Sequence, residues 1–174
     1  MKYNRVDIMN QVRELSRYVS YPSKNHLTAM YWVMEYVLNT SNHGLLLKPT
    51  ESWDGNPNFK FTVLGQLDSD YAKDKDTRCS IAGWSVFLCG SPVSIKSKML
   101  QVVSLSVTGA ELFATCNCLQ DMMFVLRILE SISLKVKLPM VLQLDNKGGT
   151  QLIGPAMNMQ YGSKPIPSDC TVSL

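Results

Sequence analysis

Three carboxylic acids of this chain, Asp68, Glu111 and Asp145, lie inside or at the end of apolar stretches, whereas most of its 14 acids have polar neighbours. An ionised carboxylate in apolar surroundings is costly unless it is paired or binds a metal ion. Carboxylate oxygens are the ligands that Mg²⁺ and Mn²⁺ prefer. Three such acids, brought together from separate elements, would form a divalent-cation site.

Each acid also has an ordinary structural interpretation. Asp68 ends an apolar run, where a turn aspartate is common. Glu111 follows Thr108 at the spacing of a capping box, in which the glutamate accepts the backbone N–H of the capping residue. Asp145 and Asn146 precede two glycines and can simply form a turn. For each acid the sequence leaves both interpretations open.

The elements that must position these acids begin with two helices. Apolar residues recur at helical spacing over residues 7–20, with Asp7 as the candidate N-cap, and again beyond Ser23, which can cap a second helix. We expect a helical hairpin over residues 1–47, which must dock on something else because two helices form only a thin core. The turn-rich residues 48–58 predict a linker.

Beyond the linker the periodicity changes from helix to strand. Two runs, residues 59–68 and 79–89, and a third strand from Val93 predict an antiparallel meander, with a turn at Gly90-Ser-Pro. A long helix is expected over residues 108–132, and residues 140–144 predict a strand that rejoins the sheet in parallel. The predicted fold class is therefore α/β, with a mixed sheet.

The long helix carries a continuous apolar stripe that we expect to face the sheet. The stripe consists of Leu112, Cys116, Leu119, Met123, Leu126 and Leu129. Glu111 shares a face with Ala114 and Cys118, which places it at the buried edge of this stripe. A role facing the sheet is therefore the alternative to a cap for Glu111.

Composition sets broad bounds on location and partners. A net charge of +3 and a pI near 8.6 permit a polyanionic partner without requiring one. Five cysteines without framework spacing indicate reduced thiols and an intracellular protein, cytoplasmic or nuclear. The first residues lack the apolar segment of a signal peptide, and no uninterrupted apolar run has the ~20 residues of a membrane span. We expect a soluble chain without a membrane partner.

Several motifs occur in an order that is typical of one family. Residues 68–84 begin Asp-Ser-Asp-Tyr-Ala-Lys-Asp and end Thr-Arg-Cys-Ser-Ile-Ala-Gly-Trp, residues 92–98 read Pro-Val-Ser-Ile-Lys-Ser-Lys, residues 105–112 read Leu-Ser-Val-Thr-Gly-Ala-Glu-Leu, and residues 144–146 read Leu-Asp-Asn. In this order they resemble motifs of the ribonuclease H region of copia-type retrotransposon polyproteins. Residues 22–26, Pro-Ser-Lys-Asn-His, resemble the C-terminal tail of the reverse transcriptase that precedes that region.

The resemblance implies a ribonuclease-H-like domain over residues 59–153, which would hydrolyse the RNA strand of RNA–DNA hybrids. Asp68, Glu111 and Asp145 match the three leading catalytic acids of the family. Two Mg²⁺ or Mn²⁺ ions about 3.5–4 Å apart would bracket the scissile phosphate. By the resemblance, Asp68 would bridge both ions, Asp145 would help hold the ion that activates water, and Glu111 the ion that stabilises the leaving oxygen. The hybrid would be recognised by its shape and its 2′-OH groups, and no small-molecule cofactor is implied.

Basic and polar residues near these acids are candidates for contacts with nucleic acid. They are Lys73, Lys75, Arg78, Lys96, Lys98 and Asn146. For the cations, solvated loop charge is an interpretation at least as good as phosphate binding.

The chain departs from the family in two places. Gly109 replaces a glutamate of the family, which weakens the start of the helix but spares Glu111. The family continues with a His-rich segment that supplies a fourth acid, a further helix and a fifth strand, whereas residues 154–174 here predict an irregular tail. We therefore expect a domain truncated at its C-terminus, from a polyprotein with an upstream reverse transcriptase, with weakened activity. Because the fourth acid is missing, the alternative is a non-catalytic retroelement remnant that at most binds nucleic acid.

Overall fold

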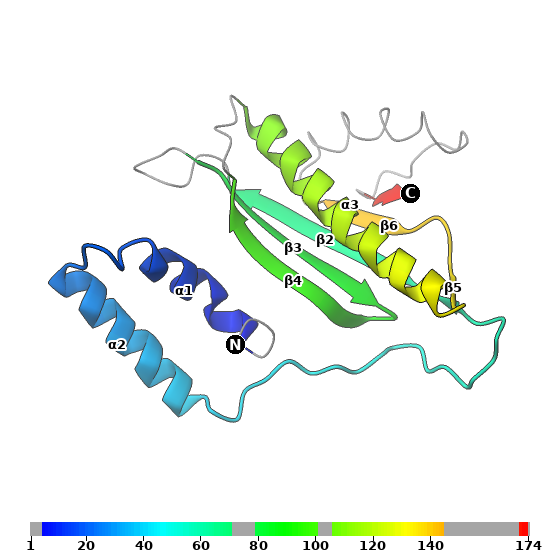
Figure 1. Ribbon diagram of the computed structural model, residues 1–174, viewed down its shortest axis with the longest axis horizontal. Coiled ribbons are helices and arrows are strands. Elements are labelled where there is room, and N and C mark those ends of the chain that lie inside the picture. Colours follow the sequence, from blue (N-terminus) through cyan, green and yellow to red (C-terminus); the bar gives the residue numbers. More distant parts are fainter. Residues whose placement is uncertain (1–4, 71–78, 101–105, 145–170, 174) are drawn as a thin grey trace. The chain divides into compact units, whose positions relative to one another are not determined.

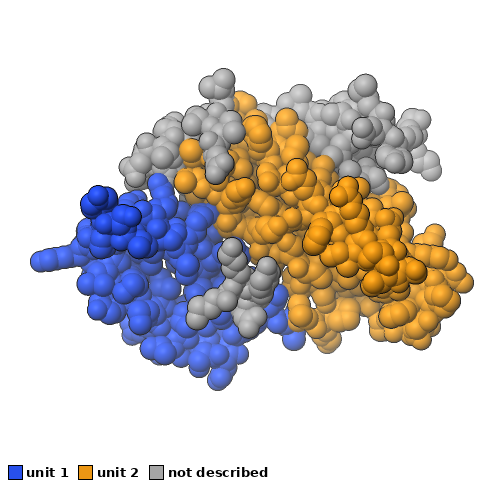
Figure 2. All heavy atoms as spheres, viewed as in Figure 1, with its two compact units in different colours: residues 1–46 blue, residues 47–174 orange. Residues whose placement is uncertain are grey.

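The computed structural model describes residues 5–70, 79–100, 106–144 and 171–173. The chain divides into two compact units, Met1–Leu46 and Leu47–Leu174, which Figure 2 shows in different colours.

The first unit is a helical hairpin, as the sequence predicts. A 3₁₀ turn, Val6–Ile8, leads into α1 (Met9–Ser16), and α2 spans Lys24–Asn39. Ser23 caps α2 as expected, because its side chain accepts the backbone N–H of His26 at 3.3 Å. The local rules for helix starts therefore account for α2.

The start of the hairpin is held to the end of α2 by Arg5. Its guanidinium donates to the carbonyl oxygen of Thr40 at 3.2 Å and to the Thr40 hydroxyl at 2.6 Å, and it lies over the Tyr36 ring. The same guanidinium binds the Asp7 carboxylate at 2.9 Å, and this hydrogen bond lowers the pKa of Asp7 to about 2. The prediction of Asp7 as a helix N-cap is wrong, because Arg5 takes the carboxylate and no side chain caps α1.

The second unit is a mixed sheet with a long helix on one face (Figure 1). Five strands pair in the order β4-β3-β2-β6-β7. Their bounds are Val63–Asp70 for β2, Ile81–Leu88 for β3, Ser91–Met99 for β4, Val141–Leu144 for β6 and Thr171–Ser173 for β7. Two short strands, β1 (Lys60–Phe61) and β5 (Lys135–Val136), pair separately in parallel. The predicted meander of β2, β3 and β4 and the parallel return of β6 beside β2 are confirmed.

The turn between β3 and β4 lies slightly earlier than the sequence suggests. Cys89 and Gly90 have φ angles of 48° and 82°, and two successive positive φ values characterise the type I′ hairpin turn. Ser91 and Pro92 already belong to β4, the edge strand of the sheet, where proline is tolerated. The predicted turn at Gly90-Ser-Pro is therefore wrong in its last two residues.

The described end of the chain adds a fifth strand to this sheet. Thr171–Ser173 form β7, which pairs antiparallel with β6. The prediction of an irregular tail over residues 154–174 is wrong for these three residues, and so is the expectation of a sheet without a fifth strand. Three residues are too few to show a periodicity, and they pair through the backbone edge of β6. Residues 154–170 and 174 lie outside the described residues.

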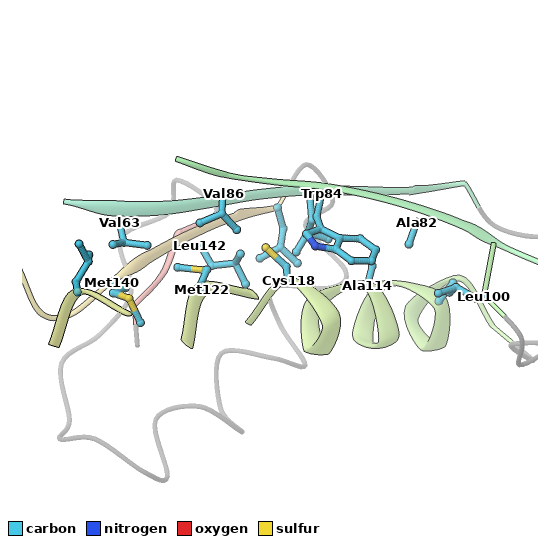
Figure 3. Close-up of a cluster of buried hydrophobic side chains, with 14 residues drawn as sticks. Val63, Ala82, Trp84, Val86, Leu100, Ala114, Cys118, Met122, Met140 and Leu142 are labelled. Atoms are coloured by element: carbon cyan, nitrogen blue, oxygen red, sulfur yellow. The ribbon is translucent and has the colours of Figure 1, made fainter. Parts of the chain in front are cut away.

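Helix α3 (Val107–Ser131) packs on the sheet through small and flexible side chains (Figure 3). Its fully buried apolar residues are Ala110, Ala114, Cys118 and Met122. The predicted stripe is wrong for three of its six residues, since Leu112 is 50% exposed, Met123 is 39% exposed and Cys116 is exposed. The other three are confirmed, because Leu129 is buried and Leu119 and Leu126 pack against the core. The helix is apolar on two faces, so periodicity alone cannot choose between them. The face with small residues packs inward because Gly65 of β2 lets α3 approach closely.

Over Gly109–Ser131, α3 is also long and apolar enough to cross a membrane by length and composition alone. Glu111, Asp121 and Arg127 interrupt this segment, so the sequence shows no uninterrupted apolar run. Packing against the sheet accounts for the apolar character of its inner face.

Candidate functional site

The ends of three elements meet at one edge of the sheet. Strands β2 and β6 are parallel neighbours, with Leu67 paired to Leu144, so their carboxyl ends lie at the same edge. Strand β4 runs in the same direction as β2, because each is antiparallel to β3, and the chain therefore leaves β4 at this edge. Helix α3 begins there and runs back across the sheet (Figure 1). In α/β folds, ligands bind outside the carboxyl ends of strands.

Asp68 lies in this region as part of β2. It pairs with Gly83 of β3 and its side chain is exposed. Its neighbour Leu67 belongs to the buried core, and side chains alternate along a strand, so Asp68 points to the face opposite α3. The interpretation of Asp68 as a turn residue is wrong, because regular strand continues to Asp70.

Glu111 lies near the start of α3 and is only 5% exposed. The helix begins at Val107, and its N-cap is Ser106, whose hydroxyl oxygen accepts the backbone N–H of Gly109 at 3.1 Å. The predicted capping box between Thr108 and Glu111 is therefore wrong. Glu111 instead lies at the N-terminal end of the buried face of α3, as its alternative role facing the sheet requires.

Asp68 and Glu111 therefore lie at the same edge of the sheet, but Asp68 points away from the face that α3 covers. Asp145 lies outside the described residues, and so do four of the candidates for nucleic-acid contacts, Lys73, Lys75, Arg78 and Asn146. The three-acid set therefore stays a prediction. Within the described parts of the chain, no three His, Cys, Asp or Glu side chains are grouped so as to hold a metal ion.

Of the basic candidates on β4, Lys96 has a partner within the fold. Its ammonium group lies 2.7 Å from an oxygen of Asp121 on α3, and Lys98 follows two residues later on the same strand. Asp121 also accepts hydrogen bonds from the Trp84 indole N–H at 2.8 Å and the Ser94 hydroxyl at 3.1 Å. A phosphate contact by Lys96 would therefore have to compete with Asp121.

Asp121 is the residue that sequence reasoning missed. Partial burial opposes its ionisation, but the hydrogen bonds from Lys96, Trp84 and Ser94 outweigh burial and lower the pKa of Asp121. Nearby, burial and then the charge of Asp121 raise the pKa of the Cys118 thiol to about 12. The signal in the sequence was an acid within an otherwise apolar helix. Its partners could not be identified from the sequence, because they lie on β3 and β4, which are distant in the chain.

Comparison with known proteins places the chain in a polyprotein family. It is 32% identical over 152 residues to the retrovirus-related Pol polyprotein from transposon RE1 of Arabidopsis thaliana, and 31% identical over 137 residues to that from transposon TNT 1-94 of Nicotiana tabacum. These matches cover 87% and 79% of this chain. The chain belongs to the copia-type retrovirus-related Pol polyproteins.

This copia-type Pol segment spans 10% of the length of each of those polyproteins. It is also 30% identical over 121 residues to the secreted RxLR effector protein 161 of Plasmopara viticola, which covers 70% of this chain and 80% of that relative. No protein-family model and no solved structure matches the chain.

Proposed function

We propose that this copia-type Pol segment is a ribonuclease H-type domain that hydrolyses the RNA strand of RNA–DNA hybrids. The mixed sheet with a helix on one face is compatible with a ribonuclease-H-like fold. The observation that carries the proposal is the pairing of Leu67 with Leu144, because Asp68 and Asp145 follow them directly in the sequence. The two residues that directly precede these acids therefore lie on neighbouring strands, ~4.8 Å apart.

The donor set suits Mg²⁺ or Mn²⁺. Asp68, Asp145 and Glu111 offer only carboxylate oxygens, which these ions prefer over softer ligands. Asp68 and Asp145 would hold the ions from the sheet. Glu111 lies on the buried face of α3 whereas Asp68 points to the opposite face, so Glu111 would have to reach the ions around the shared edge. When bound, the ions supply activation of the attacking water and stabilisation of the charge that develops at the phosphate. The acids themselves orient the ions and position the scissile strand.

A cleavage assay with Asp68→Asn tests the proposal. The full chain is incubated with a labelled RNA–DNA hybrid and Mn²⁺, and RNA fragments are measured. Substitution of a metal ligand should reduce the rate at least ~100-fold, since even the outer shell of a metal site is worth 10–100-fold. Asp54→Asn is the matched control, because Asp54 accepts the N–H of Asn56 at 2.9 Å and asparagine keeps an acceptor oxygen there.

The proposal requires cleavage by the natural chain and by Asp54→Asn. The natural chain and Asp68→Asn must both be shown by circular dichroism to be folded. Equal cleavage rates for the two would then show that any nuclease activity does not depend on Asp68. A natural chain that binds the hybrid but leaves the RNA intact at high protein concentration would support the non-catalytic alternative.

One observation favours this alternative, a retroelement remnant that at most binds nucleic acid. The chain covers 80% of a relative whose name is that of a secreted effector, so a segment of this kind occurs outside a Pol polyprotein. The reverse transcriptase partner and the cytoplasmic or nuclear location belong to the ribonuclease H proposal and would not apply to an isolated remnant.

A further inference from the structure

The turn between α1 and α2 is closed by a histidine. The backbone N–H of Ser23 donates to Nδ1 of His26 at 3.1 Å, while the backbone N–H of His26 donates to the Ser23 hydroxyl at 3.3 Å. This reciprocal pair is a capping box, in which the side chain at the third helical position is usually a glutamate or glutamine. Here a titratable base holds that position, in the Pro-Ser-Lys-Asn-His motif that the proposed chemistry does not use.

The hydrogen bonds define the protonation state of His26. A backbone N–H can only donate, so Nδ1 must present its lone pair and the proton of the neutral ring lies on Nε2. A protonated imidazole donates from both nitrogens and cannot accept the Ser23 N–H. It would also add positive charge to the first turn of α2, where the helix dipole favours negative charge. Protonation therefore removes one half of the capping box.

The groups around His26 are an aromatic ring and charges of both signs. Its ring stacks on Tyr18, with ring centroids 3.9 Å apart and an angle of 22° between the planes. The Arg17 guanidinium lies over the Tyr18 ring at 5.7 Å and pairs with Glu14 at 3.2 Å. Lys24 belongs to the same first turn of α2. The titratable and charged groups at this turn thus include Tyr18, Arg17 and Glu14 from α1 and its end, Tyr21 between the helices, and Lys24 from α2.

The other end of the hairpin does not change its charge in the same pH range. There Arg5 joins Asp7 to Thr40, and the hydrogen bond from Arg5 holds the pKa of Asp7 at about 2. Between pH 5 and 8 that contact stays ionised and intact. The contact between Arg5 and Asp7 would therefore not respond in this range, and the second histidine of this unit, His43, requires a control.

We propose that His26 makes the turn between α1 and α2 pH-responsive: the neutral imidazole closes the turn, and the protonated one releases the start of α2. The Arg5 contact keeps the other end of the hairpin joined, so the response is a local opening of the first turn of α2.

Hydrogen exchange of the full chain tests this proposal. The Leu27 amide, which donates to the Ser23 carbonyl oxygen at 3.1 Å, reports on the first turn of α2. After correction for the intrinsic rate, its protection should fall about fivefold from pH 7.5 to pH 5, the fold-change that corresponds to a helix cap. In His26→Gln the protection should be independent of pH, because glutamine can accept the Ser23 N–H at every pH in this range.

The chain contains two histidines, so His43→Gln is a matched control and should keep the pH dependence of the natural chain. A second readout uses the natural chain alone: the amide chemical shift of Ser23 should follow the titration of the His26 ring. Equal Leu27 protection at pH 7.5 and pH 5, or a Ser23 shift that does not follow the ring, would overturn the proposal. So would a pH dependence that survives in His26→Gln.

Discussion

Asp121 joins α3 to the sheet, and its removal should destabilise the second unit. Its carboxylate accepts from the Trp84 indole N–H, the Ser94 hydroxyl and the Lys96 ammonium group. Trp84 is only 5% exposed, so its N–H has little access to water when the acceptor is lost. Asp121→Ala removes all three interactions, whereas Asp121→Asn keeps a neutral acceptor and loses the ion pair.

The burial of the partners of Asp121 determines how much each of the two substitutions should destabilise the second unit. A buried donor left without an acceptor costs about 1–3 kcal/mol. The ion pair contributes at most about 1 kcal/mol, because the Lys96 side chain is 52% exposed and water screens the pair. We therefore expect the free energy of unfolding to fall by about 2–4 kcal/mol in Asp121→Ala and by about 1 kcal/mol or less in Asp121→Asn.

Urea unfolding of the full chain, followed by tryptophan fluorescence, measures these losses. Lys96→Gln, alone and combined with Asp121→Asn, gives the coupling energy of the ion pair in a double-mutant cycle. Equal losses in Asp121→Ala and Asp121→Asn would refute the reasoning, because the hydrogen bond from Trp84 would then carry no measurable energy.

Asp121 should also affect how the free energy of unfolding changes with pH in the acidic range. Because folding lowers the pKa of Asp121, its contribution is complete above the unfolded pKa of about 3.9 and is lost as the pH falls through the folded value. In Asp121→Asn the free energy of unfolding should therefore fall less steeply below about pH 4 than in the natural chain.

Two further substitutions test the packing and the start of α3. Gly65→Ala should lower the free energy of unfolding by about 1–3 kcal/mol, because the added Cβ would lie 2.5 Å from the Met122 sulfur and 2.7 Å from a methyl carbon of Leu142. A melting temperature equal to that of the natural chain would contradict the close approach of α3 to Gly65. Ser106→Ala should lower the free energy of unfolding by about 1 kcal/mol, because the Gly109 N–H loses its acceptor, whereas Ser106→Asp should retain stability. Equal chemical denaturation midpoints for the natural chain and both variants would exclude capping by Ser106.

The order of helices and strands could be predicted because each depends on local patterns. The Ser23 cap, the change from helical to alternating periodicity and the long helix before a short apolar strand all appear in the structure. The inward face of α3 could not be predicted. It has apolar residues on both faces, and the choice depends on Gly65, which lies in a different element.

The candidate site, like the fold, has some features that local sequence patterns predict and others that depend on distant residues. The family motifs identify Asp68, Glu111 and Asp145 from the sequence, and the pattern around Ala114 and Cys118 places Glu111 toward the sheet. The N-cap of α3 is Ser106, two residues before Thr108, the N-cap that the capping-box spacing predicts. The partners of Asp121 are 25 to 37 residues away in the chain, so no local pattern could reveal them.

The sequence by itself determined the kinds of elements, their order and the family, since these depend on periodicity, turn residues and motifs that each occupy a short stretch. Only the tertiary structure decided which face of α3 is buried, that Thr171–Ser173 join the sheet, and that Asp68 and Glu111 share one edge. Those features depend on the register between distant strands and on the space that small residues leave, and neither quantity is encoded in a short window of sequence.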